Sequence, residues 1–229
     1  MHRAAFLRPL VGELLGSGLL AAVVIGSGIM AQRLSPDDVG LQLLQNAFAT
    51  ALGLAVLILV FQPISGAHFN PVVTLADAAM RGRAWRTVMP YAAAQIAGCL
   101  AGAVLAGAMF GTPVAFSTTD RATPGNLLAE VVATAGLVLV VFALARTGRQ
   151  HLAAPAVGAY IGAAYFFTAS TSFANPAITI GRTLSDTFAG IAPSSAPAFI
   201  LAQLVGGAVG AVLAAWLVPA GSREPVSTR

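Results

Sequence analysis

The sequence predicts an all-helical membrane protein with six spanning helices and two shorter re-entrant helices. Three observations lead to this class: the composition, the lengths of the apolar segments and an internal repeat. Of 229 residues, 57% are hydrophobic and 9% are charged, whereas soluble domains carry about 25% charged residues. A soluble fold could not bury this much apolar surface, so we expect a single integral membrane domain covering residues 1–229.

Apolar segments of about 20 residues span a ~30 Å hydrocarbon core as helices. Six segments have about this length: 9–31, 41–62, 86–110, 126–146, 152–171 and 196–218. The first is expected to be an uncleaved spanning helix, because it is long and no Ala-x-Ala site follows it. Two further segments, 71–80 and 176–185, are too short to span. They are expected to be half-helices, which membranes tolerate only where protein or water surrounds them.

Both short segments begin with Asn-Pro, in the boxes Asn70-Pro71-Val72 and Asn175-Pro176-Ala177. Asn is a favourable N-cap, and Pro fits the first helical position, where the missing N–H would have no partner. A helix N-terminus carries about half a positive charge. Two such termini that meet at mid-membrane predict a selective pore.

The chain repeats itself. Residues 94–105 match residues 202–213, the stretch around Glu13 matches that around Glu130, and the two Asn-Pro boxes lie 105 residues apart. Each half, approximately 1–112 and 120–221, therefore holds three spans and one half-helix. Because three is odd, the second half must be inserted upside down, as in inverted-repeat membrane proteins.

The charged residues lie mainly between the apolar segments. With six spans, nine of the twelve arginines share one side, and the others are Arg33, Arg121 and Arg182. The positive-inside rule then places both termini in the cytoplasm. No basic run suggests nucleic acid, and Cys99, the lone cysteine, excludes an intrachain disulfide and a multi-thiolate metal site. No metal and no cofactor are expected.

The paired Asn-Pro boxes, the run Ser65-Gly66-Ala67-His68-Phe69 before the first box, the Glu in the first and fourth spans and the repeated Ala-Gln-x-x-Gly blocks resemble the aquaporin/aquaglyceroporin family, also called the major intrinsic proteins. The resemblance implies that Asn70 and Asn175 point their amides into the pore. It implies that Glu13 and Glu130 accept hydrogen bonds from the re-entrant loops. It also implies a homotetramer with one pore in each subunit.

The chain departs from the family at the narrowest point of the pore. The family's Arg, three residues after the second Asn, is replaced by Ile178. The implied constriction consists of Thr50, Thr168 or Ala169, Ser172 and Ile178. It lacks a fixed cation, an aromatic ring and an imidazole, so we expect a wider opening and a weaker barrier to cations. This pattern resembles bacterial aquaporin-like channels that are linked to metalloid efflux.

Charged residues also follow each box at matching steps. Asp77 and Arg81 follow Asn70 by 7 and 11 residues, and Arg182 and Asp186 follow Asn175 by the same steps. Each pair has the i,i+4 spacing of a helical ion pair. Alternatively, Arg182 shares a helical face with Ile178 and adds positive charge to the outer vestibule.

The leading hypothesis is a passive channel in a bacterial cytoplasmic (inner) membrane. Its expected solutes are water, glycerol-like polyols, and arsenite or methylated arsenicals. One alternative is a water or glycerol channel with an unusual filter. A second alternative is a secondary transporter, in which Glu13 or Glu130 would couple transport to ions. An enzyme is not expected, because the sequence contains no nucleophile–base constellation, metal-ligand cluster or phosphate loop.

Overall fold

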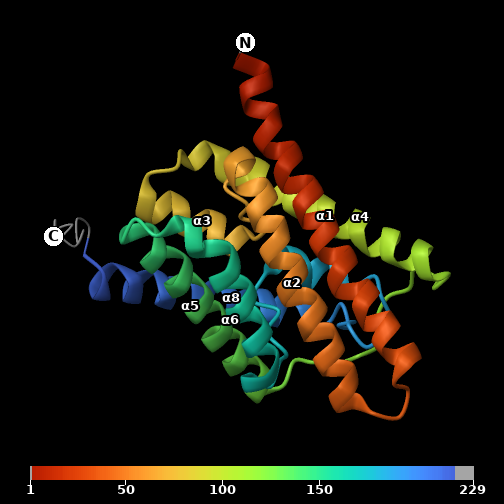
Figure 1. Cartoon of the computed structure of the whole chain (residues 1–229). Coiled ribbons are helices and arrows are strands. Elements are labelled where there is room, and N and C mark those ends of the chain that lie inside the picture. The colour runs from red at the N-terminus through yellow and green to blue at the C-terminus, as the bar shows by residue number, and fades with distance from the viewer. Residues whose placement is uncertain (1, 220–229) are drawn as a thin grey trace, which may run out of the picture.

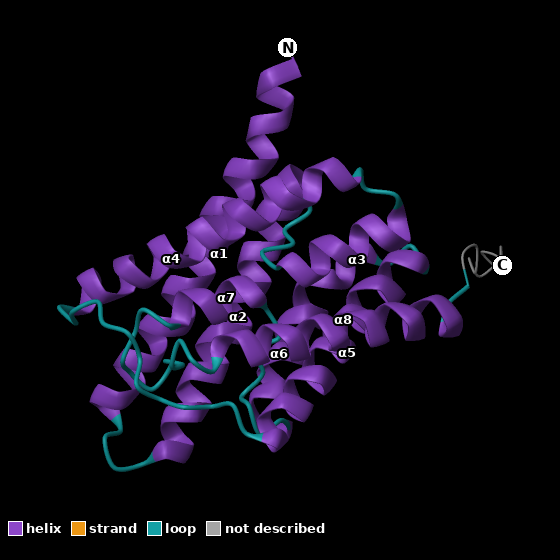
Figure 2. Cartoon of the chain, turned by 180° about the vertical axis from the view of Figure 1, so that it is seen from behind, coloured by secondary structure: helices purple, strands orange, loops and turns teal. Residues whose placement is uncertain are grey.

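Eight α-helices and two short 3₁₀ turns form the part of the chain that the computed structural model describes, residues 2–219 (Figure 1). These residues contain no β-strand (Figure 2). The elements are α1 (His2–Leu34), α2 (Val39–Ser65), α3 (Pro71–Arg81), η1 (Trp85–Thr87), α4 (Val88–Phe110), α5 (Pro124–Arg146), η2 (Gln150–Leu152), α6 (Ala153–Phe167), α7 (Pro176–Arg182) and α8 (Ala196–Leu217). Two of the arginines used in the topology prediction, Arg223 and Arg229, lie outside the described residues.

The helices pack in the same pattern in both halves of the chain. In the first half α1 packs mainly on α4 and α2, and in the second half α5 packs mainly on α8 and α6. The two short helices connect the halves, because α3 contacts α8 as well as α4, and α7 contacts α4 as well as α8. The all-helical membrane fold with two half-helices is therefore confirmed.

Glycines allow the long helices to approach one another closely. A Cβ atom at Gly98 of α4 would lie 2.2 Å from the carbonyl oxygen of Leu14 in α1. A Cβ atom at Gly206 of α8 would lie 2.4 Å from the carbonyl oxygen of Val131 in α5. Small residues permit such backbone contacts between membrane helices. The repeated Ala-Gln-x-x-Gly blocks thus mark the crossing of the first and last long helix in each half.

Some helix boundaries differ from the predicted ones. In the part of the chain that the structure describes, five helices are long and apolar enough to cross a membrane. Helix α1 begins earlier than predicted and extends beyond the rest of the molecule (Figure 1). The predicted span 152–171 is shorter, because α6 has 15 residues and the next residue, Thr168, has an extended backbone.

The second half-helix is also shorter than predicted. It has 7 residues and ends at Arg182. The amides of Thr183 and Leu184 bond three residues back, to Ile180 at 3.1 Å and Gly181 at 3.2 Å. Such 3₁₀-type bonds tighten and end an α-helix.

Candidate functional site

The two half-helices meet at their N-termini, where each cap reaches across the junction. The side-chain oxygen of Asn70 accepts a hydrogen bond from the Val72 amide at 2.9 Å, and its Nδ2 donates to the carbonyl of Ala174 at 2.7 Å. In the same way, Nδ2 of Asn175 donates to the carbonyl of Phe69 at 2.7 Å. A primary amide has two N–H donors, so one donor of each Asn is left for the cavity that both side chains line.

The carboxylate of Glu13 holds the loop that precedes the first half-helix. Glu13 is fully buried in α1 and accepts hydrogen bonds from the amides of His68 at 3.0 Å and Phe69 at 2.7 Å. The Ser65 hydroxyl and the Gln95 amide donate to the same carboxylate at 2.6 and 2.7 Å. A buried carboxylate is costly unless it is hydrogen-bonded, and these four donors satisfy it.

The carboxylate of Glu130 holds the loop that precedes the second half-helix. This fully buried side chain of α5 accepts from the amides of Phe173 at 2.9 Å and Ala174 at 2.8 Å. The Ser170 hydroxyl and the Gln203 amide complete its shell, each at 2.6 Å. Neither Glu13 nor Glu130 lies in the wall of the central cavity.

These bonds hold the loops in an unfavourable backbone conformation. The φ angles of Ala67 and Phe69 are 51°, and those of Ser172 and Ala174 are 52° and 47°. Residues other than glycine rarely adopt positive φ, at a cost on the order of 1–3 kcal/mol each. Phe69 and Ala174 are the residues whose carbonyls accept the amide of the opposite Asn, so this backbone shape orients the two acceptors at the junction.

A cavity of about 120 Å³ runs past the junction. One water requires about 10–15 Å³ by such a measure, so the cavity has room for several waters or for one small polyol. Apolar side chains from four long helices form much of its wall: Leu20, Val24, Leu54, Ile58, Leu137 and Ile161. Within residues 2–219, no group of three or more His, Cys, Asp or Glu side chains could hold a metal ion.

Three of the residues expected at the constriction line this cavity together. Thr50, Ser172 and Ile178 are buried and belong to its wall. Thr168 and Ala169 do not: the Thr168 hydroxyl donates back to the carbonyl of Ala164 at 2.6 Å, and Ala169 is exposed. They lie beyond the C-terminal end of α6, which stops at Phe167.

Tyr165 is the α6 residue beside Thr50, and sequence reasoning missed it. Its hydroxyl lies 3.1 Å from the Thr50 hydroxyl, and both residues line the cavity. Val157 and Ile161 line it too, so the wall residues of α6 are four apart. Residues at this spacing share one helical face, and the spacing is the signal that could have identified Tyr165 from the sequence.

Arg182 is the last residue of the second half-helix. It is buried, lines the cavity, and places its guanidinium carbon 3.4 Å from the centre of the Phe173 ring. Its Nε donates to the carbonyl of Ala189. The i,i+4 ion pair with Asp186 is not formed, because the helix ends at Arg182 and the Asp186 carboxylate accepts instead from the Thr118 amide at 2.9 Å.

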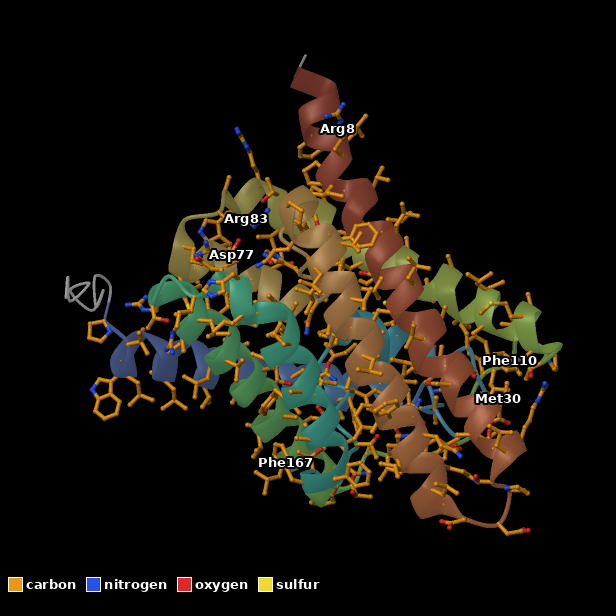
Figure 3. The ribbon with its side chains drawn as sticks, viewed as in Figure 1. Arg8, Met30, Asp77, Arg83, Phe110 and Phe167 are labelled. Atoms are coloured by element: carbon orange, nitrogen blue, oxygen red, sulfur yellow. The ribbon has the colours of Figure 1, made fainter. Side chains whose placement is uncertain are left out.

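Asp77 lies on the corresponding part of the first half-helix, among cationic side chains. Its carboxylate is 2.6 Å from Nε of Arg83, 3.5 Å from Nε2 of His68 and 3.7 Å from Nη1 of Arg81. The expected pair with Arg81 is therefore present, but the shorter contact is with Arg83 (Figure 3). Since the half-helices meet at their N-termini, Asp77 and Arg182 lie on opposite sides of the junction, and we call these ends the Asp77 mouth and the Arg182 mouth.

Comparison with known proteins identifies the family. Residues 1–172 match the model of the family described as "Major intrinsic protein". The chain is 46% identical over 213 residues to aquaglyceroporin AqpS of Rhizobium meliloti (strain 1021), covering 92% of this chain and 90% of the relative. It is 34% identical over 232 residues to aquaporin NIP1-3 of rice, Oryza sativa subsp. japonica, covering 94% of this chain and 74% of the relative.

The fold agrees with a solved structure. The aquaglyceroporin from Plasmodium falciparum superposes with a TM-score of 0.70 at 18% sequence identity, covering 91% of this chain and 95% of that one. The chain thus belongs to the major intrinsic protein family, the family of aquaporins and aquaglyceroporins. It is a multi-pass membrane channel of this family.

Proposed function

We propose that the protein is a passive channel with a wide constriction that conducts neutral solutes larger than water. The observation that carries this proposal is Ile178, a buried apolar side chain in the cavity wall where the family's pattern has an Arg. A guanidinium at the narrowest point of a pore fills space and supplies hydrogen-bond donors. Its absence therefore widens the pore and removes those donors. A pore's selectivity depends on its diameter and on the donors and acceptors that line it.

The constriction that we propose consists of Thr50, Tyr165, Ser172 and Ile178. Three of these residues carry hydroxyls, which exchange hydrogen bonds with the hydroxyls of a solute, whereas Ile178 contacts its carbon atoms. A polyol presents both kinds of surface. Relatives of this chain include an aquaglyceroporin and the glycerol uptake facilitator protein of Streptococcus pneumoniae, which is 33% identical over 150 residues, and these names support a polyol-sized substrate.

Arsenite and methylated arsenicals are the further solutes that we propose. They are small hydroxylated molecules, and the methylated forms add an apolar group that suits Ile178. The thiol of Cys99 would be the soft ligand for arsenic, but Cys99 is fully buried and lies outside the cavity wall. A pore wall without a thiol favours transit of arsenic over capture.

We place the Asp77 mouth and both termini on the cytoplasmic side of a bacterial inner membrane, because most of the arginines lie on that side of the predicted topology. We also propose a homotetramer, as the family resemblance implies.

A secondary transporter, which is not a channel, is the alternative function. The contacts of Glu13 and Glu130 favour the channel. An ion-coupling carboxylate must reach the transport path and change its protonation or ion occupancy. Both carboxylates instead accept hydrogen bonds from four protein donors and lie outside the cavity wall. A structural role fits these contacts better.

Stopped-flow measurements on proteoliposomes test the proposal. The permeabilities to water, glycerol, arsenite and a methylarsenical are measured in parallel, with protein-free liposomes as the control. We expect fluxes of glycerol, arsenite and the methylarsenical above the control, without saturation and without dependence on a proton gradient. Flux of water alone would refute the wide constriction, and gradient-coupled uptake would favour a transporter.

A further inference from the structure

Arg182 is a buried cation in the pore wall without an acidic partner. Every ion pair within residues 2–219 involves Asp77, so none involves Arg182. Of its guanidinium nitrogens only Nε has a hydrogen bond, to Ala189, and the two Nη groups have no partner in the described part of the chain. An unpaired charge at membrane depth is costly, and such residues commonly mark transport paths.

The corresponding residue of the other half is neutralised. Asp77 follows Asn70 by seven residues, as Arg182 follows Asn175. Around Asp77, however, lie Arg83 at 2.6 Å, Arg81 at 3.7 Å and His68 at 3.5 Å. The Asp77 mouth therefore has no free negative charge to attract cations, while Arg182 has no ion-pair partner within residues 2–219.

A second unpartnered polar group belongs to a residue of the same cavity wall. Ser172 belongs to the cavity wall, and its hydroxyl oxygen is buried with no hydrogen-bond partner within residues 2–219. Polar groups buried in proteins are nearly always hydrogen-bonded. A solute oxygen in the cavity would supply the partner that the Nη groups of Arg182 lack.

We infer that Arg182 is the specificity-determining residue for solute charge in this pore. Through its Nη groups it donates to solute oxygens, favours hydroxylated solutes that carry a carboxylate or other oxyanion, and repels cationic solutes of the same size. A guanidinium suits this task because it presents several donors to the paired oxygens of an oxyacid. Because Ile178 replaces the family's Arg, the sequence predicts a weaker barrier to cations. Arg182, one helical turn further along α7, supplies this barrier instead. This inference rests on the proposed function, since it requires solutes of polyol size to pass.

Three solutes of nearly equal size test it: neutral glycerol, anionic glycerate and cationic 3-aminopropane-1,2-diol. Their fluxes are measured at pH 7 in proteoliposomes that contain the full chain, and the glycerate and aminopropanediol fluxes are divided by the glycerol flux. In R182Q we expect the glycerate ratio to fall and the aminopropanediol ratio to rise, each by roughly tenfold, as expected from loss of one nearby charge. If R182Q does not assemble, R182M replaces it, because methionine retains the packing on Phe173 without the charge. We expect the same changes of both ratios in R182M.

Two further variants separate the effect of the charge of Arg182 from the effect of its contacts with Phe173 and Ala189. R182K keeps the charge but has no guanidinium to stack on Phe173 or to bond Ala189. We expect its aminopropanediol ratio within about twofold of wild type because the field is retained. Its glycerate ratio should lie between those of wild type and R182Q, because an ammonium does not offer the guanidinium's paired donors. Arg121 is the matched control. Its guanidinium binds the neighbouring carbonyls of Phe188 at 3.0 Å and Gly190 at 2.7 Å and lies 5.5 Å from the Phe173 ring, but it does not line the central cavity. R121Q removes a cation that lies outside the cavity wall, so it should change both ratios much less than R182Q does.

The outcomes distinguish the inference from the function on which it rests. If wild type does not conduct glycerol, the proposed function is wrong. If wild type conducts glycerol and the ratios of R182Q and R182M equal those of wild type, the inference is wrong. It is equally wrong if R121Q alters the ratios as much as R182Q does, or if R182K behaves like R182Q, because Arg182 would then act by holding the loop.

Discussion

The amide nitrogen of Asn70 lies 2.7 Å from the carbonyl oxygen of Ala174, a residue 104 positions further along the chain. The amide of Asn175 makes the equivalent bond to Phe69 at the same distance. Together these two bonds join the halves of the molecule at the centre of the cavity. Each Asn therefore caps its own half-helix and at the same time ties down the loop of the other.

Replacing either Asn by Asp should break this tie without removing the cap. Asp is as good an N-cap as Asn, but its carboxylate cannot donate to the opposite carbonyl. We expect N70D and N175D each to lose about 1–3 kcal/mol of stability, because a buried acceptor is left unpaired. Thermal unfolding in detergent measures the loss. Markedly unequal losses would contradict the symmetry of the two bonds.

The glutamates should behave as loop supports. In E13Q an amide NH₂ replaces one carboxylate oxygen and faces two donors, so we expect a loss of about 2–6 kcal/mol, and the same for E130Q. Flux of water and of glycerol should fall by one common factor, since the loop as a whole is affected. Well-expressed variants that lose only transport driven by a proton gradient would show that the channel hypothesis is wrong.

The helix crossing of α1 and α4 depends on Gly98. Its alanine variant would place a Cβ atom 2.2 Å from the Leu14 carbonyl oxygen, and such overpacking costs about 1–3 kcal/mol. Gly125 of α5 is the control, because a Cβ atom there meets nothing within 4 Å. We expect G98A to lower the unfolding temperature and G125A not to do so. Equal behaviour of the two variants would argue against this crossing.

Tyr165 and Thr168 distinguish the constriction that we propose from the one expected from the sequence. Tyr165→Phe removes a hydroxyl from the cavity wall, and we expect glycerol flux to fall roughly 2–10-fold, which corresponds to one ordinary hydrogen bond of about 0.5–1.5 kcal/mol. Thr168→Ala removes a hydroxyl that bonds only to Ala164, and its flux should match wild type. A lower glycerol flux in Thr168→Ala, with an unchanged flux in Tyr165→Phe, would instead indicate that Thr168 belongs to the constriction.

Much of this architecture could be predicted from the sequence, because it follows from local signals. Apolar length predicts the spans, and Asn-Pro predicts the start of each half-helix at Asn70 and Asn175. The repeat predicts that Glu13 and Glu130 have equivalent positions in the two halves. The hydrogen-bond donors that each carboxylate accepts from depend on the folded loops.

The end of a helix was harder to predict. The predicted span over 152–171 continued past the end of α6, because the residues beyond Phe167 are still partly apolar and the turn there is held by Glu130 from another helix. For this reason the sequence points to Thr168, whereas Tyr165 is the α6 residue that lines the cavity beside Thr50. The early end of α7 also explains why Arg182 does not pair with Asp186, since its surroundings depend on Phe173 and Ala189.

The most direct test of the central claim, that Ile178 in place of Arg widens the pore, is the ratio of glycerol to water permeability in wild type and in Ile178→Arg. We expect wild type to conduct glycerol well above protein-free liposomes. In I178R the ratio should fall roughly tenfold or more, because a guanidinium narrows the constriction while single waters still pass. A wild-type protein that conducts water but not glycerol, or an I178R variant with an unchanged ratio, would contradict the claim.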